Sequence, residues 1–377
     1  MNRFCFYGFL LFWILHLTSC GQKLENPKND TGKKEKKIEY LINRNEVTFR
    51  IAYNLVDREL TYPPRPNPVR DTFDSYFSNH KTDKIVMTLK KTDIGYDDML
   101  TQYLLHQKEF PDFGNKYNDS LTIKEMELDG YAGIDTLYIQ IYEELYDFYQ
   151  NAKIENFIAD MDFYYSGAIN EIKKVASRYD VIQQMEDYCR MENHRYIVSP
   201  EPLFLTGGSR GIGPSVQTDL GKICYQFISP SPNIDLNNVD YSLSSPAYGY
   251  DDNDYIRTIL VHEFGHSFVK IDLTKDANEK FINDKSSLFT EDVQQTLMNT
   301  GIGDFHTYIS EHIVRLLEIR IADKFIGEKQ AEELRKVNSA FIWLPQMEEL
   351  IIKDYESNKE KFSNFSDFIP ELLSVVI

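Results

Sequence analysis

Two histidines and a glutamate in the order H-E-x-x-H are the side chains of this sequence best placed to do chemistry. His262, Glu263 and His266 lie within the stretch Thr258–Val269. Residues four apart share one face of a helix, so the two imidazoles can bind the same metal ion. Glu263 lies about 100° round the helix from His262, where its carboxylate can reach a metal-bound water without being a ligand. The arrangement predicts one Zn2+ ion with two imidazole ligands, a general base and an open coordination position.

The surrounding residues predict that the motif lies on a helix. Acidic and amide side chains at residues 251–254 offer several N-caps just upstream. Gly265 is unfavourable inside a helix, and a small residue there would allow another element to approach closely. Apolar residues recur near helical spacing on both sides of the motif: Ile256, Ile259, Leu260, Val261, Phe264, Phe268 and Val269. The alternative is two surface or core histidines that fall in this short pattern by chance.

A catalytic zinc ion takes a third protein ligand, and the stretch His306–Arg315 is its best source. With Tyr308-Ile309-Ser310-Glu311 in this stretch, residues 250–325 resemble the gluzincin branch of the zincin metalloproteases. In that family H-E-x-x-H is followed by a second helix, often of the form aromatic-apolar-x-Glu. The resemblance implies that His262, His266 and Glu311 bind the zinc ion, that Glu263 is the base, and that the reaction is peptide-bond hydrolysis.

Other roles are open for the residues around Glu311. His312 is a rival third ligand, and Asp272, Asp276 and Glu318 are weaker ones. Glu311 could instead pair with Arg315 four residues further on. The developing oxyanion also needs a donor. His306 and Tyr308 are the candidates, and their alternative role is packing or capping at the start of the helix.

A glycine-rich stretch competes with the zinc motif. Thr206–Gly213 spells T-G-x-x-x-G-x-G, the fingerprint of short-chain dehydrogenases, and Tyr355-x-x-x-Lys359 follows downstream. In a dinucleotide site the glycines would open a helix that holds the pyrophosphate. Here Pro214 and an alternating stretch follow instead, which predicts a loop that enters a hairpin. An NAD(P)-binding oxidoreductase is therefore only a remote alternative.

The N-terminus resembles a bacterial lipoprotein signal. A short positive start is followed by an apolar run from Phe4 to Leu17, and Leu17-Thr18-Ser19-Cys20 ends it with small residues before a cysteine. Cleavage before Cys20 would leave a lipid on its sulfur and the protein on the membrane. The alternative, a transmembrane anchor, is disfavoured because the run barely spans a bilayer. Gly21 after the cysteine resembles lipoproteins sent to the outer membrane, with the periplasmic or surface face left open.

The charge of the chain excludes some classes of partner, and its cysteines leave the disulfide question open. The chain has 377 residues and a formal net charge of −18, which argues against nucleic acid or an anionic membrane surface as a partner. Beyond the signal, Cys189 and Cys224 remain. They could form a disulfide in an oxidising envelope, or lie apart as two buried thiols.

The expected fold is α+β and predominantly helical. We expect a signal peptide at 1–19, a flexible tether at 20–45, a mainly helical region at 46–194 and a zincin-like catalytic region at 195–377. The alternation of Val47, Phe49, Ile51 and Tyr53 predicts an opening strand. Residues 195–198 predict another strand, and residues 216–228 predict a hairpin around Leu220-Gly221. Zinc proteases with this motif usually have an edge strand just before it, along which the substrate backbone lies.

The sequence thus predicts a lipid-anchored cell-envelope protein that hydrolyses peptide bonds with one zinc ion. Its partners would be a peptide or protein substrate and, through the lipid, a membrane. The alternative is a zincin-like binding or scaffold protein that has lost activity. The intact Glu263 favours the enzyme, because a purely structural metal site would not need this base.

Overall fold

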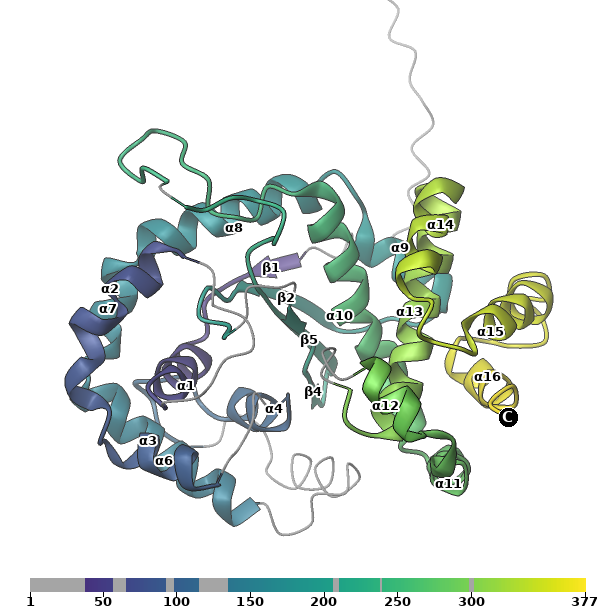
Figure 1. Ribbon diagram of the computed structural model, residues 1–377, viewed down its shortest axis with the longest axis horizontal. Helices are drawn as coiled ribbons and strands as arrows, with labels where there is room; N and C mark the ends of the chain where they lie inside the picture. Colours follow the sequence, from purple (N-terminus) through teal and green to yellow (C-terminus); the bar gives the residue numbers. More distant parts are fainter. Residues whose placement is uncertain are drawn as a thin grey trace, which may run out of the picture. The chain divides into compact units, whose positions relative to one another are not determined.

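A small mixed β-sheet with the H-E-x-x-H helix beside it is the part of the fold that positions the site (Figure 1). The structure is a computed structural model that describes residues 38–56, 66–92, 98–114, 135–205, 210–237, 239–297 and 302–377. Helices predominate over strands in these residues, which confirms the predicted α+β, mainly helical class. The predicted signal peptide, Cys20 and most of the predicted tether lie outside the described residues. No helix in the described ranges is long and apolar enough to cross a membrane.

The first half of the described chain is mainly helical, as predicted. Its helices are α1 (Arg44–Asn54), α2 (Pro68–Phe77), α3 (Lys84–Thr92), α4 (Asp98–His106), α6 (Asp135–Asn151), α7 (Ile154–Asp160), α8 (Asp162–Ala176) and α9 (Val181–Cys189), with a short 3-10 turn at Ser78–His80. Helices α8 and α9 contact the motif helix. The domain boundary predicted at residue 194 stays a prediction.

The second half contains the sheet strands β2 to β5 and the helices of the site. The strands are β2 (Arg195–Pro200), β3 (Gly211–Ile212), β4 (Ser215–Thr218) and β5 (Gly221–Ile228), and the helices are α10 (Asn253–Leu273), α11 (Asp276–Asp284), α12 (Glu291–Leu297), α13 (Phe305–Phe325), α14 (Glu328–Val337), α15 (Leu344–Leu350) and α16 (Ile369–Leu373). Short 3-10 turns lie at Ser286–Leu288 and Ser366–Phe368, and a π-helical turn, Ile351–Glu356, follows α15.

The sheet has parallel strands inside and an antiparallel edge. The strand order is β1 (Ile38–Tyr40), β2, β5 and then β3, with β4 also paired to β5. β1, β2 and β5 are parallel, whereas β3 and β4 run antiparallel to β5. Gly211 lies opposite Ile228 and Ser215 lies opposite Cys224, so β3 and β4 keep one register along β5. The hairpin predicted at residues 216–228 is confirmed, and Gly221 at its turn has a φ of +116°.

The opening strand predicted at Val47–Tyr53 is wrong, because these residues form most of helix α1. The side chain of Asn43 caps the helix by accepting a hydrogen bond from the Glu46 amide at 3.0 Å. Every residue from Asn45 to Tyr53 is buried, so polar and apolar residues alike face the protein. Alternation predicts a strand only when one face is solvated. In α1 neither face is solvated, because its polar side chains find partners inside the protein. Asn45, for example, donates a hydrogen bond to the Leu104 carbonyl.

Both described cysteines are buried and free. Cys189 ends α9 and Cys224 lies in β5. The disulfide, one of two possibilities for this pair, is therefore absent, and the structure agrees with two separate buried thiols. Burial raises the pKa of the Cys189 thiol well above its usual range, so this cysteine is a poor nucleophile.

Candidate functional site

The H-E-x-x-H motif lies in the middle of α10, as predicted. Asp252 caps this helix by accepting a hydrogen bond from the Tyr255 amide at 3.1 Å. A Cβ added at Gly265 would lie only 3.1 Å from Cγ1 of Val314 in α13. The missing side chain therefore allows α10 and α13 to pack closely, which is the use predicted for this glycine. Figure 1 shows these two helices side by side.

Helix α13 brings Glu311 to the two histidines. Oε1 of Glu311 lies 3.4 Å from Nε2 of His266, and Oε2 lies 3.7 Å from Nε2 of His262. Two ligand atoms of a tetrahedral zinc site are about 3.3 Å apart, given zinc–ligand distances near 2.0–2.1 Å. Each oxygen of the Glu311 carboxylate lies near a different histidine. To share one ion with both histidines, the carboxylate would have to rotate so that one of its oxygens faces the ion.

Glu263 belongs to the same cluster. Ligand atoms of His262, Glu263 and His266 all lie within 4.8 Å of one another, a grouping that could hold a metal ion. The side chain of Glu263 also lies against the edge of the sheet, since a Cβ added at Gly211 would come within 2.4 Å of its Oε1. The carboxylate is thus held between α10 and strand β3, beside the histidines.

Glu318 orients His262 from the opposite side of the ring. Its Oε1 accepts a hydrogen bond from Nδ1 of His262 at 2.6 Å. A proton held on Nδ1 directs Nε2 toward a metal, which is the usual arrangement for a metal-binding histidine. The sequence makes Glu318 a weak alternative for the third ligand, and the structure gives it this orienting position instead. Its side chain is 2% exposed, against 14% for His262 and 13% for Glu311.

Arg315 completes the charged cluster. Its guanidinium lies 3.3 Å from Oε2 of Glu311 and 3.7 Å from Oε2 of Glu318. The pairing of Glu311 with Arg315 is therefore present together with its contacts to the histidines. Burial opposes ionisation of Glu311, but His262, His266 and Arg315 outweigh it and hold the pKa of this carboxyl below its usual range.

The carboxylates also favour the charged form of His262. Burial disfavours the imidazolium, but the negative charges of Glu311, Glu318 and Glu263 and the hydrogen bond that His262 donates to Glu318 raise the pKa of His262 to about 9. The site therefore already stabilises positive charge at the position of this imidazole.

A cavity of about 570 Å3 opens over the cluster. Residues 210–215 of the sheet edge and the motif residues His262, Glu263 and His266 of α10 line it. Its lining also includes Lys270, one helical turn beyond His266, and five residues of α13: His306, Thr307, Ser310, Glu311 and Arg315. The cavity has the size of a ligand site and has convergent polar groups.

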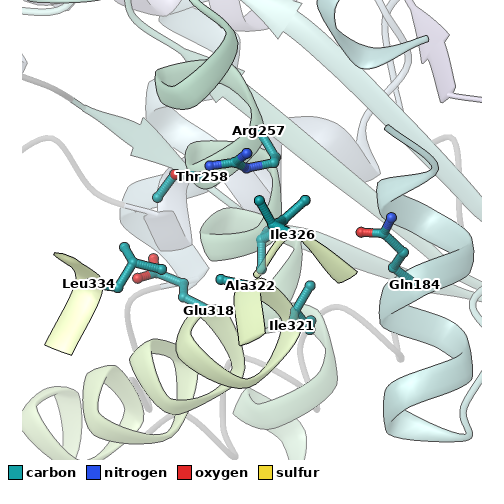
Figure 2. Close-up of a pocket in the computed structure, with 9 residues that line it drawn as sticks. Gln184, Arg257, Thr258, Glu318, Ile321, Ala322, Ile326 and Leu334 are labelled. Atoms are coloured by element: carbon teal, nitrogen blue, oxygen red, sulfur yellow. The ribbon is translucent and has the colours of Figure 1, made fainter. Parts of the chain in front are cut away.

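A second, much smaller cavity shares two lining residues with the large one. It has a volume of about 20 Å3, room for about one water molecule. Figure 2 shows Glu318 and Thr258 among its lining residues, together with Arg257 and Gln184. Glu318 and Thr258 also line the large cavity. Glu318 thus lies between the two cavities, largely shielded from solvent.

Of the two candidate oxyanion donors, only His306 lines the large cavity. Tyr308 is fully buried, its hydroxyl donates to the Ala340 carbonyl at 2.9 Å, and its ring stacks with Phe341. The expectation of Tyr308 as a donor is therefore corrected: its hydroxyl already has a main-chain partner and its ring fills the core. Arg315, which the sequence suggested only as a partner of Glu311, is a further cavity-lining donor.

His312, the rival third ligand, lies in the core. Its Nδ1 donates to the Tyr308 carbonyl at 2.8 Å, and its Nε2 accepts the Trp343 amide at 3.4 Å. Burial lowers the pKa of His312 to about 4, against a raising contribution from the Tyr308 bond. This histidine is neutral and uses both nitrogens within the protein. Asp272 is also buried elsewhere, where it contacts Lys275 and Ser366, and neither Asp272 nor Asp276 lines the cavity.

The described part of the glycine-rich stretch forms the sheet edge. Gly211 and Ile212 make up strand β3, and strand β4 follows at Ser215; Thr206–Ser209 lie outside the described residues. A dinucleotide site would need a helix at this point. Tyr355 donates its hydroxyl to the Tyr188 carbonyl at 2.8 Å in the core, and neither Tyr355 nor Lys359 lines the large cavity. The described residues thus agree with the predicted hairpin, whereas Gly211 and Ile212, which were expected in a loop, form a short strand.

The sequence did not indicate the hydrogen bond of Glu318 to His262, the contact of Arg315 with Glu318, or the contact of Gly211 with Glu263. A signal was present for the first two, because Glu311, Arg315 and Glu318 follow one another at helical spacing of four and three residues. The contact of Gly211 with Glu263 had no such local signal.

Comparisons with known proteins give one family. Neither the curated proteins nor the solved structures contain a match to this chain. One family model, described as a domain of unknown function (DUF4932), matches residues 69–375. Because this match covers the sheet edge, both site helices and most of the chain, the protein belongs to the DUF4932 family.

Proposed function

We propose that this protein is a zinc-dependent peptidase in which His262, His266 and Glu311 hold one zinc ion. One observation carries the proposal. The oxygens of Glu311 lie 3.4 and 3.7 Å from the Nε2 atoms of the two histidines, while Glu318 binds Nδ1 of His262. Three potential ligands and an orienting carboxylate are the components of a catalytic zinc site.

The charges of the cluster fit a divalent cation. Glu263, Glu311 and Glu318 bring three carboxylates together, and Arg315 is the one guanidinium in contact with Glu311 and Glu318 among the described residues. With neutral histidines the excess is two negative charges, which a divalent ion would offset. Oε2 of Glu311 is buried and makes no hydrogen bond in the described ranges, although it pairs with the Arg315 guanidinium at 3.3 Å. Metal coordination would satisfy such an atom.

In the proposed reaction Glu263 is the general base. A zinc ion bound at the cluster would polarise the scissile carbonyl and make a water acidic enough to attack at neutral pH. Glu263 accepts the proton of that water and passes it to the leaving amine. Its position against the sheet edge keeps the carboxylate beside the histidines. His306 and Arg315 line the cavity, and they are the proposed donors to the developing oxyanion.

The substrate is proposed to be an extended peptide. The β3–β4 edge lies along the cavity, and an extended chain can add to such an edge through main-chain hydrogen bonds.

α10 and α13 are antiparallel, because His262 meets Glu318 whereas His266 meets Glu311. The antiparallel edge strand before the motif helix and the glutamate on the next long helix support a zincin-like fold, in line with the resemblance.

The proposed location is the bacterial cell envelope. It rests on the lipoprotein-like start with Cys20, through which a lipid would hold the protein on a membrane, most readily the outer one. A binding or scaffold protein with the same metal site is the second candidate, which the cleavage assay below separates from the enzyme.

Metal analysis tests the proposal directly. We expect the purified protein to contain about one zinc ion per chain and to cleave casein or a peptide library, and His262→Ala to lose the metal and the cleavage. Elemental analysis after gel filtration measures the metal content. Zinc in the wild type without any cleavage would favour the binding protein, and a wild type that binds no zinc even when supplied with it would rule out both functions.

The affinity for zinc is expected to rise with pH up to about 9. The pKa of His262 in the metal-free protein is about 9, and zinc binds neutral imidazole, so below this pH the ion must displace a proton. Each pH unit of acidification should weaken binding about tenfold on this account. Competition with a chromophoric chelator from pH 6 to 10 measures the slope. A plateau that already begins near the ordinary histidine pKa of about 6.5 would contradict it.

A further inference from the structure

Two glycines let the edge of the sheet lie directly on Glu263. A Cβ added at Gly211 would lie 2.4 Å from Oε1 of Glu263 and 2.7 Å from its Cδ and Cγ. At Gly213 it would lie 2.2 Å from the main-chain oxygen of Glu263. Real Cβ atoms essentially never come within 3.0 Å of such neighbours. Neither glycine has a positive φ, so space and not backbone conformation requires them.

The same two glycines carry the outward-facing main-chain groups of this strand. The carbonyls of Arg210 and Pro214 accept hydrogen bonds from the Ser229 and Tyr225 amides of the neighbouring chain segment, both at 2.9 Å. Successive residues of an antiparallel strand direct their N–H and C=O groups to opposite sides. Gly211 and Gly213 therefore direct theirs away from β5. Within the described chain no further strand pairs with that side.

Side-chain directions agree with this register. Ile212 and Val216, which alternate with the glycines, lie in a separate apolar cluster with Ile223 and Phe227. On the glycine face, Gln226 of β5 donates to the Leu260 carbonyl and Lys222 donates to the Ser267 carbonyl, at 2.7 and 2.6 Å. The glycine face is thus the one that meets α10.

We propose that Gly211 and Gly213 are positioning residues that hold the Glu263 carboxylate beneath the peptide-binding edge. This inference rests on the proposed peptidase function. The outward main-chain groups and the contact with the Glu263 carboxylate belong to the same short segment, so a peptide paired with the edge would pass beside this carboxylate. A methyl group at Gly211 would displace either the carboxylate or the strand. The last two glycines of the dehydrogenase-like fingerprint thus have a different use here.

A double-mutant cycle tests the contact without any activity assay. Gly211→Ala is expected to lower the thermal unfolding midpoint by about 2 °C or more, as overpacking does. In a Glu263→Ala background the clashing Oε1, Cδ and Cγ are gone, so the same change should cost almost nothing. Gly213→Ala meets the main chain of Glu263 and should not be rescued. Gly303→Ala is the matched control, because a Cβ there has no neighbour within 4 Å.

The pH dependence of the visible spectrum of the Co2+-loaded protein tests whether Gly211 positions the Glu263 carboxylate. The visible Co2+ spectrum changes with pH as groups at the ion titrate, and Glu263→Gln is expected to shift that midpoint. We expect Gly211→Ala to shift it in the same direction and Gly303→Ala to leave it unchanged. If Glu263→Gln shifts the midpoint while Gly211→Ala behaves as wild type, the positioning role fails and the proposed function stands.

The remaining outcomes are equally decisive. A protein that binds no Co2+ and no Zn2+ overturns both the function and this inference. Equal destabilisation by Gly211→Ala in both backgrounds overturns the contact with the carboxylate, on which the positioning role depends. If the single variant is too unstable to purify while the double variant folds, the contact is supported.

Discussion

Glu263→Gln is expected to reduce peptide hydrolysis about 10²–10⁴-fold, the range for loss of a general base. Glutamine keeps the shape of the side chain but cannot accept the proton of the attacking water. Glu263 is proposed as the base and not as a ligand, so the zinc content should stay near one ion per chain. Cleavage of a fluorogenic peptide from a library hit, together with elemental analysis of the same sample, measures both quantities.

The surroundings of Glu263 explain why Glu263→Gln should lower kcat more than it raises KM. The carboxylate lies under the sheet edge at Gly211, and a glutamine of the same length fits the same space without disturbing the edge where the peptide is proposed to bind. A variant with full activity would rule out Glu263 as the base. Loss of zinc from this variant would instead make Glu263 a ligand, as its distance of at most 4.8 Å from the histidine ligand atoms permits.

Glu311→Gln is expected to weaken zinc binding at least tenfold more than Glu318→Gln. Both substitutions remove one negative charge from the same helix, and both carboxylates contact His262 and Arg315. Only Glu311 lies near Nε2, the proposed ligand nitrogen, so its substitution would remove a proposed ligand. Glu318 acts through Nδ1, and loss of such an outer partner costs about 10–100-fold in metal affinity. Chelator competition at one pH gives both affinities.

His312→Gln provides the second comparison for the third ligand. It should leave zinc affinity unchanged and lower stability, because the Trp343 amide and the Tyr308 carbonyl lose a buried partner at a cost of about 1–3 kcal/mol. Zinc loss in this variant, with Glu311→Gln behaving as wild type, would reverse the assignment. Thermal unfolding of the metal-free proteins separates loss of stability from loss of the ion.

Much of the site follows from local spacing. His262 and His266 share a face because a helix places residues four apart together, and the helix itself is indicated by its caps and apolar periodicity. The β-hairpin at 216–228 was predictable for the same kind of reason, since its strands alternate around a short turn with a glycine. The helix α1 was not, because burial on all sides removes the periodicity that distinguishes a strand from a helix.

Local spacing could not decide which of several neighbouring residues of α13 belongs to the site. Glu311, His312 and Tyr308 lie within five consecutive positions of α13, and each was a reasonable candidate for the site. Which of them faces α10 depends on the rotation of α13, which its packing with α10 sets, including the close approach of Val314 to Gly265. That packing directs Glu311 to the histidines and leaves His312 and Tyr308 among aromatic residues of the core.

The sequence by itself determined which groups the H-E-x-x-H segment brings together, two imidazoles and a carboxylate on one helix, and it predicted a glutamate on a later helix as the third ligand. The tertiary structure alone decided what surrounds them. Glu318 at Nδ1 of His262, Arg315 between two carboxylates, and the glycine edge on Glu263 all depend on contacts between segments far apart in the chain. Local spacing specifies which residues share a face, whereas the packing of helices and sheet specifies what that face meets.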